Sequence, residues 1–223
     1  MPLRVRDGLS FCEIDGHVLF LDIPNDHYFE LPPRLEAVFL NYLCNVESSL
    51  PEYRVLLKCG VLTDAAVKTA PAGFPAVEAP RRSVFEGGMC RNDAYEGTAL
   101  EVLVTVAWTQ LRLKAAGLDR TLRSISHRRD RILPSAATRE SGNQLAGASL
   151  AFAARRPLVP INNRCLLDSL SLVAFLARRQ LAAKIVFGVV RSPFSAHCWV
   201  QAGDLVLNDT VGNVSSHTPI LVL

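Results

Sequence analysis

The sequence lacks the cysteine and acidic patterns of a structural metal site. Its six cysteines are scattered, without a C-x-x-C pair or the spacing of zinc ligands, at positions 12, 44, 59, 90, 165 and 198. An acidic metal cluster and a phosphate-binding G-x-x-x-x-G-K loop are also missing. We therefore expect no metal, no cofactor and no disulfide framework.

Long hydrophobic runs and basic arms are missing as well. No run approaches the ~20 apolar residues of a membrane-spanning helix, and the opening residues, MPLRVRDGLS, contain no apolar core of signal-peptide length. The arginine clusters are interleaved with apolar positions at residues 128–131, 155–156 and 178–179. We expect a cytoplasmic protein with reduced thiols and solvated arginine-bearing helix faces, and neither a membrane nor a nucleic acid as partner.

The composition is that of an ordinary globular protein. Hydrophobic residues make up 49% of the chain and charged residues 20%, and 223 residues suffice for two small domains, each with a core. An Ala-, Pro- and Gly-rich stretch, TDAAVKTAPAGFPAVEAPRRS, separates the halves. We predict an α+β protein with a first domain at residues 1–70, a linker at 71–90 and a second domain at 91–223.

The first domain begins with segments whose pattern is typical of β-strands. LSFCEI, HVLFLDI and HYFEL are separated by the turns Asp15-Gly16 and Pro24-Asn25-Asp26, which predicts a three-stranded meander over residues 9–31. Apolar residues at helical spacing then predict a helix after Pro32-Pro33, and a second helix runs from Pro51 to Gly60. A meander followed by helices is a winged-helix-like plan, whose mixed charges argue against phosphate contacts.

Helices dominate the first part of the second domain. Residues 95–117 predict a long buried helix that ends at Gly117, and a shorter helix follows at 118–131. Residues 133–160 carry little signal and leave two alternatives, a helix at about 147–156 or a mobile loop. The last residues, HTPILVL, predict a final strand.

Cys165 stands where an apolar helical run begins. Polar residues precede it, and the run LLDSLSLVAFLARRQL follows it. The free amide groups and dipole of a helix N-terminus favour a thiolate, which is the nucleophilic form of cysteine. The next segment, AKIVFGVVR, is apolar on both faces and predicts a strand at the centre of a sheet.

His197 and Asp209 fall on the arms of a predicted hairpin around Gly203 and Asp204. A two-residue loop would pair Cys198 with Asp209 and turn His197 to the other face. A three-residue loop at 202–204, or a bulge, would set His197 opposite Asp209 and allow a Cys165-His197-Asp209 triad. A lone cysteine or histidine here would indicate packing, but their joint occurrence favours catalysis.

Trp199 alternates onto the face of His197. Two roles are equally open for it: a wall of the catalytic cleft, or packing in the core.

The C-terminal segment resembles lasso-peptide B proteins, the leader peptidases of the transglutaminase-like superfamily. The shared motifs are C-L-x-x-S-L from Cys165, F-G-V from Phe187, A-H-x-W-V from Ala196 and N-D at Asn208-Asp209. The resemblance implies a papain-like cysteine protease domain with Cys165 as nucleophile, His197 as base and Asp209 as orienting carboxylate. Cys198 departs from the family pattern, and we interpret it as a packing residue.

The first domain carries a second, shorter resemblance. D-x-x-x-x-x-Y-F-x-L, from Asp22 to Leu31, is similar to the leader-peptide recognition element of peptide-modifying enzymes. In that family a leader adds as a strand beside the third strand of the meander. Here the implied binding edge consists of His27, Tyr28, Phe29, Glu30 and Leu31.

Together the resemblances imply a peptidase that removes the leader from a ribosomal precursor peptide during lasso-peptide maturation. Its implied partners are that precursor and a separate ATP-using lasso cyclase. Two alternatives stay open from the residues alone: a transglutaminase-like acyltransferase, in which an amine replaces water, and a peptide-binding protein without activity.

Overall fold

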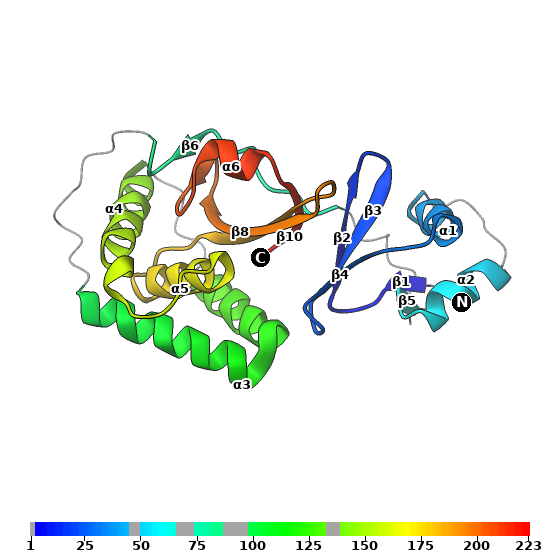
Figure 1. Ribbon diagram of the computed structural model, residues 1–223, viewed down its shortest axis with the longest axis horizontal. Coiled ribbons are helices and arrows are strands. Elements are labelled where there is room, and N and C mark those ends of the chain that lie inside the picture. The colour runs from blue at the N-terminus through cyan, green and yellow to red at the C-terminus, as the bar shows by residue number, and fades with distance from the viewer. Residues whose placement is uncertain (1–2, 45–49, 66–73, 87–97, 133–138) are drawn as a thin grey trace. The chain divides into compact units, whose positions relative to one another are not determined.

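The computed structural model describes residues 3–44, 50–65, 74–86, 98–132 and 139–223, and it shows the predicted α+β combination of elements (Figure 1). The chain divides into two compact units, Met1–Pro75 and Ala76–Leu223, so the division falls within the predicted linker. Within the described ranges, no helix combines the length and the apolar character of a membrane span.

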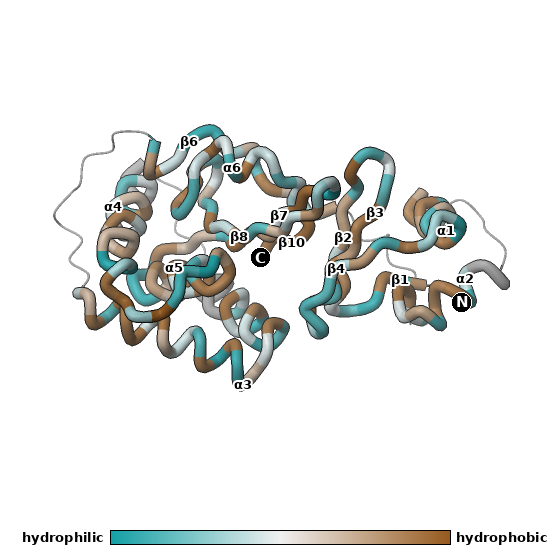
Figure 2. The backbone as a smooth tube through the Cα atoms, in the orientation of Figure 1, coloured by the Kyte–Doolittle hydropathy of each residue, from teal (hydrophilic) through white to brown (hydrophobic). Residues whose placement is uncertain are grey.

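The first unit contains the predicted meander. Its antiparallel strands lie in the order β2 (Leu9–Ile14), β3 (His17–Asp22) and β4 (His27–Glu30). Asp15 and Gly16 connect β2 to β3 with φ angles of 53° and 77°, as a tight hairpin turn requires. This turn is hydrophilic in Figure 2, whereas the strands beneath it are largely hydrophobic.

Both predicted helices of the first unit are present. They are α1 (Pro33–Leu43), which begins at a proline, and α2 (Leu50–Lys58), which Gly60 follows in the left-handed conformation with φ 69°. A small sheet of β1 (Leu3–Val5) and β5 (Leu62–Asp64) was not predicted. These strands are too short to show a periodic pattern.

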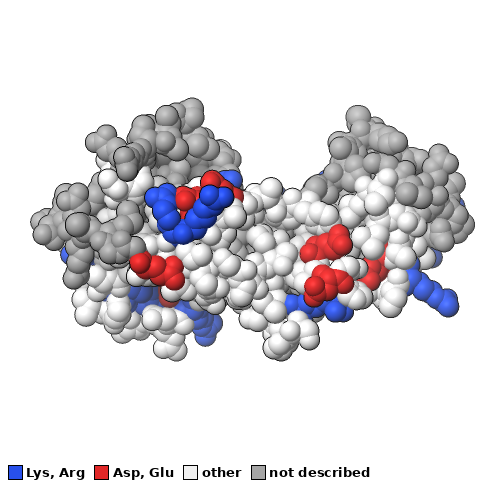
Figure 3. Space-filling view, turned by 90° about the horizontal axis from the view of Figure 1, so that it is seen from above, with Lys and Arg blue, Asp and Glu red and all other residues white. Residues whose placement is uncertain are grey.

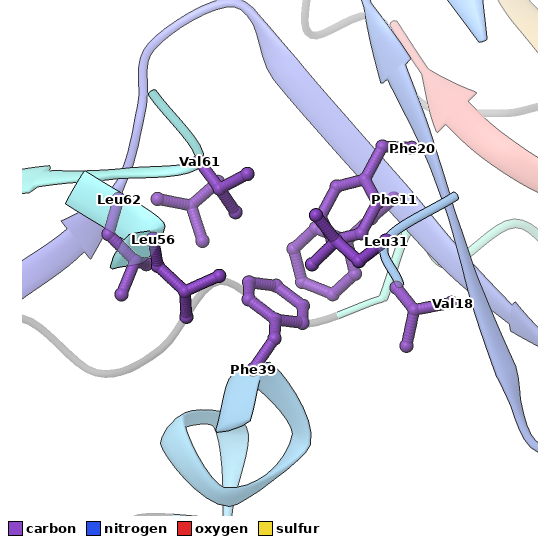
Figure 4. Packing of buried hydrophobic residues seen from close by; sticks show 9 residues of the cluster. Phe11, Val18, Phe20, Leu31, Phe39, Leu56, Val61 and Leu62 are labelled. Atoms are coloured by element: carbon purple, nitrogen blue, oxygen red, sulfur yellow. The ribbon is translucent and has the colours of Figure 1, made fainter. Parts of the chain in front are cut away.

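An aromatic cluster forms the core of the first unit (Figure 4). Phe39 of α1 meets Phe11 and Phe20 edge-on, with ring centroids 5.1 and 4.9 Å apart, and Phe29 stacks on Phe20 at 5.1 Å. Full burial of one such side chain stabilises a fold by roughly 1.5–3 kcal/mol. Since Phe29 faces this core, Tyr28 lies on the other face of β4.

The second unit is built on a five-stranded sheet in the order β10-β7-β8-β9-β6. Its strands are β6 (Arg82–Ser83), β7 (Lys184–Val190), β8 (Ser195–Ala202), β9 (Leu205–Val206) and β10 (Thr218–Val222). The apolar segment AKIVFGVVR thus forms an interior strand, and the predicted final strand is confirmed. β6 runs parallel to β9 and brings a distant part of the chain to the sheet edge.

The helices of the second unit are α3 (Ala99–Ile132), α4 (Arg139–Arg155), α5 (Cys165–Arg178) and α6 (Val211–Ser215), with a 3₁₀ turn η1 at Arg156–Leu158. Gly117 interrupts α3 with φ 76°, as predicted. The region left open between helix and loop contains α4, a helix that begins earlier than the predicted one.

α5 packs against both α3 and the sheet, and its buried face is apolar. Arg179 forms an ion pair with Glu101 of α3 at 2.7 Å, and its guanidinium lies 3.6 Å from the centroid of the Phe175 ring. These contacts fix the helix that begins at Cys165.

Charges of both signs share the surface shown in Figure 3. On that face the described Lys and Arg side chains lie among Asp and Glu side chains. The face therefore lacks the single-sign field that nucleic-acid binding favours, as far as its described residues show.

Candidate active site

Cys165 is the first residue of α5, as predicted. Arg164 before it is extended, with φ −143° and ψ 130°, and places no side-chain cap on the helix. The first-turn amide groups are therefore available near the sulfur. The Cys165 side chain is exposed, whereas the helix behind it is buried.

A buried arginine holds the segment that leads to Cys165. Arg156 is 5% exposed; its Nε donates to Asp168 Oδ1 at 2.7 Å, and its Nη atoms donate to the carbonyls of Ile161 and Asn162. The prediction of a solvated face for this residue was wrong. The 3₁₀ turn after α4 directs Arg156 inward, where a carboxylate and two carbonyl groups satisfy its charge and its donors.

His197 on β8 and Asp209 lie in contact. His197 Nε2 is 2.5 Å from Asp209 Oδ2, and both side chains are less than one-fifth exposed. His197 also hydrogen-bonds Cys165. Because Nε2 faces Asp209, Nδ1 is the nitrogen left for the sulfur. The structure thus brings the three predicted residues together.

The odd-length hairpin loop, one of the two predicted routes of Asp209 to this position, was wrong. The hairpin loop has two residues, because Ala202 pairs with Leu205 and Gln201 with Val206. β9 ends at Val206, although the Leu207 amide still donates to the Val200 carbonyl at 2.9 Å, and the chain bends over residues 207–209. The bend turns Asp209 toward His197 without an odd-length loop.

Three further groups hold Asp209. Ser83 Oγ of β6 donates to its carbonyl oxygen at 2.5 Å, and the Thr210 amide donates to Oδ1 at 2.7 Å. Asn213 Nδ2 of α6 donates to Oδ2 at 2.9 Å. Both carboxylate oxygens therefore have donors besides His197. Sequence reasoning missed Ser83 and Asn213, and no motif marks them.

A second buried network joins α5 to β8. Asn208 Nδ2 donates to Ser169 Oγ at 2.9 Å, and Ser169 Oγ donates to the Cys198 carbonyl at 2.9 Å. Asn208 Oδ1 accepts the Val200 amide at 2.7 Å. Ser169 lies one turn after Cys165, and Cys198 follows His197, so this network sets the helix of the thiol against the strand of the imidazole.

The electrostatics of the pair favour charge separation. The hydrogen bond with His197 lowers the pKa of the Cys165 thiol, and the Cys198 and Leu166 amides lower it further against the effect of burial. The hydrogen bond with Asp209, followed by that with Cys165, raises the pKa of His197 to about 9. Burial raises the pKa of Asp209, but its hydrogen bonds outweigh this and lower it overall. Both shifts favour transfer of the thiol proton to the imidazole, which gives a thiolate beside an imidazolium.

Trp199 stacks on the His197 imidazole. It is 1% exposed, its ring lies 6.1 Å from that of His197, and its Nε1 donates to Gln201 Oε1 at 3.0 Å. Trp199 packs in a buried cluster with Val186, Val206 and Val214, which favours the core-packing role over a wall of the cleft. Gly188 makes room for it: a Cβ there would lie 2.5 Å from the indole and 2.9 Å from the His217 Cβ.

The predicted leader-binding residues lie in the first unit. His27, Tyr28, Phe29 and Glu30 form β4, an edge of the three-stranded sheet, and Leu31 follows it. Phe29 and Leu31 belong to the aromatic core or its border. Tyr28 faces the other way and is half-buried.

Among the described residues, no group of three or more His, Cys, Asp or Glu side chains is placed to hold a metal ion. A comparison with protein families finds that the family model described as the transglutaminase-like superfamily matches residues 102–222. This stretch covers more than half of the chain and contains all three residues of the Cys165-His197-Asp209 arrangement. Neither the curated proteins nor the solved structures yield a match.

Proposed function

Since the chain belongs to the transglutaminase-like superfamily, we propose that it is a cysteine peptidase that cleaves the leader from the core of a ribosomal precursor peptide. The observation that carries the proposal is that Asp209 and Cys165 both hydrogen-bond the imidazole of His197. One of its nitrogens meets Asp209 Oδ2 at 2.5 Å, and the ring hydrogen-bonds Cys165 at the start of α5.

The first half of the reaction follows from this arrangement. The Cys165 thiolate attacks the peptide carbonyl and forms a carbon–sulfur bond, while the Cys165 amide stabilises the oxyanion. The imidazolium then gives its Nδ1 proton to the leaving amine as the carbon–nitrogen bond breaks. The products of this half are an acyl-enzyme, a neutral imidazole and a core peptide with a free N-terminus.

The second half releases the leader. The neutral His197 takes a proton from water, and the resulting hydroxide attacks the thioester. The carbon–sulfur bond breaks, the leader leaves with a new carboxyl group that loses its proton to solvent, and the thiolate-imidazolium pair is restored. Asp209 keeps Nε2 protonated in both halves, which leaves Nδ1 as the nitrogen that exchanges protons.

We propose the first unit as a winged-helix-like module that binds the leader. β4 is an edge strand, so a peptide can extend the sheet through main-chain hydrogen bonds. Tyr28 lies on the face of β4 opposite Phe29, and we propose that it contacts the added strand. The cleaved core would pass to a separate ATP-using lasso cyclase.

The test is to incubate the purified protein with a co-encoded precursor peptide and to read the masses of the products. Two fragments whose masses sum to the precursor plus one water support the peptidase. An adduct with an added amine indicates an acyltransferase, and an unchanged but bound precursor indicates a binding protein.

Two cysteine variants sharpen this experiment. Cys165→Ala is expected to abolish cleavage. Cys59→Ala, which removes an exposed thiol of the first unit, is expected to leave cleavage intact. Full cleavage by Cys165→Ala would refute the mechanism.

A further inference from the structure

Asn213 lies at the meeting point of the imidazole and the carboxylate. Its Nδ2 is 2.9 Å from Asp209 Oδ2 and 3.4 Å from His197 Nε2. Nε2 carries the proton that it shares with Asp209, so it cannot accept a second one from the amide. The Asn213 amide therefore donates to the same carboxylate oxygen that receives the imidazole.

The backbone around Asn213 is fixed. Its amide N–H donates to Thr210 Oγ1 at 3.3 Å, which caps α6, and its carbonyl accepts the Ser216 hydroxyl at 2.7 Å. The ring nitrogen Nδ1 of His217 lies 2.9 Å from the same carbonyl. A side chain anchored in this way has a defined direction toward Asp209.

Asp209 needs such an anchor because it is not part of a strand. It lies in the bend of residues 207–209, beyond the last residue pair of the β8–β9 ladder. The Thr210 amide restrains Oδ1, and Asn213 gives Oδ2 a donor besides His197 that opposes rotation of the carboxylate about its Cβ–Cγ bond.

We propose that Asn213 is a positioning residue that aligns Asp209 Oδ2 with His197 Nε2 and so keeps Nδ1 directed at Cys165. The Asn213 side chain donates to Asp209 and therefore acts on the imidazole through that carboxylate. Its hydrogen bond also contributes to the lowered pKa of the Asp209 carboxyl. The kinetic part of the test rests on the proposed peptidase activity, whereas the titration below does not.

The kinetic test uses Asn213→Leu, which keeps the approximate volume and removes the donor. We expect kcat for precursor cleavage to fall about tenfold, as the loss of one hydrogen bond to a charged group implies. KM should stay within about twofold, since the group makes no substrate contact. Gly212→Ala is the matched control on α6, because a Cβ there meets nothing within 4 Å. An unchanged kcat, or equal changes in kcat and KM, would overturn the proposal.

The titration uses Asn213→Asp, a nearly isosteric change that places a second carboxylate beside Nε2. NMR of the His197 ring carbon should show its pKa rise from about 9 by about one unit, because a nearby negative charge stabilises the imidazolium. Gly212→Ala should titrate like the unmodified protein. This result supports the geometry even if the precursor is not cleaved or Asn213→Leu does not fold. A His197 titration that is identical in Asn213→Asp would show that residue 213 does not face the pair.

Discussion

Ser169 and Asn208 form a direct, partly buried hydrogen bond of 2.9 Å between the helix that carries the thiol and the chain beyond the strand that carries the imidazole. Ser169 is fully buried and also donates to the Cys198 carbonyl. A change at Ser169 therefore leaves two polar groups unpaired in the interior, where water cannot replace the lost partner.

Ser169→Ala is expected to lower the free energy of unfolding by about 1–3 kcal/mol and to reduce precursor cleavage, because α5 is no longer tied to β8. Urea unfolding and cleavage kinetics measure the two effects. Ser171→Ala is the matched control: Ser171 lies on the same helix, is equally buried, and bonds only the Leu167 carbonyl within α5. If both substitutions lower the unfolding free energy and the cleavage rate equally, the hydrogen bonds between α5 and β8 are not the cause of the effect.

The charged state of His197 gives the site a stability that depends on pH. Its pKa in the folded protein is about 9 against an ordinary 6.5, so its stabilisation is complete below pH 6.5 and is lost as the pH rises through about 9. The pKa of Asp209 is lowered from 3.8, so its stabilisation is present above that value and is lost as the pH falls through the folded pKa. Both contributions are present together between about pH 4 and 6.5.

Asp209→Asn removes the main cause of the raised His197 pKa. The difference in unfolding free energy between the unmodified protein and this variant should be widest at about pH 5–6 and should narrow toward pH 9.5. Urea unfolding at pH 5.5, 7.5 and 9.5 measures it. A difference that stays constant over this range would show that the ion pair does not form.

The elements that carry the site could be predicted because each has a local signal. The apolar run after Cys165 predicts a helix start, and the residues around His197 alternate as a strand does. Asp209 has no such signal, since its position depends on where β9 stops and the chain bends. The hairpin has the two-residue loop that Gly203 and Asp204 favour as a turn. The prediction of an odd-length loop failed because it assumed that the second strand continues to Asp209.

The groups that hold the site could not be predicted, because their partners are distant in the sequence. Ser83 meets the Asp209 carbonyl across 126 positions, and β6 is only two residues long. Arg156 belongs to a pair of arginines whose pattern fits a solvated face equally well. Periodicity describes which face is apolar, but it does not reveal which buried carboxylate or carbonyl a single polar residue will meet.

Gly188 is required because the Trp199 indole and the His217 Cβ leave no room for a side chain there. Gly188→Ala would push a methyl group to 2.5 Å from the Trp199 indole, which is fully enclosed and cannot move aside. We expect a loss of about 1–3 kcal/mol of unfolding free energy from overpacking. The Trp199 ring stacks on His197, so the NMR signal of the His197 ring should also shift. Gly212→Ala, with open space around its Cβ, should change neither the unfolding free energy nor the His197 signal. A Gly188→Ala protein of unchanged stability would refute the crowding at Gly188.

The proposed leader contact and the packing of the core involve opposite faces of β4. Tyr28 lies opposite the core, whereas Phe29 stacks on Phe20 with ring centroids 5.1 Å apart. Tyr28→Ala is expected to weaken binding of a fluorescently labelled leader peptide by about tenfold, the effect of losing one well-packed aromatic contact, with a smaller loss of unfolding free energy than Phe29→Ala. Phe29→Ala should instead lower the stability of the first unit by about 3–5 kcal/mol. Fluorescence anisotropy measures the affinity. If Tyr28→Ala binds the leader as tightly as the unmodified protein, β4 does not recognise it through this face.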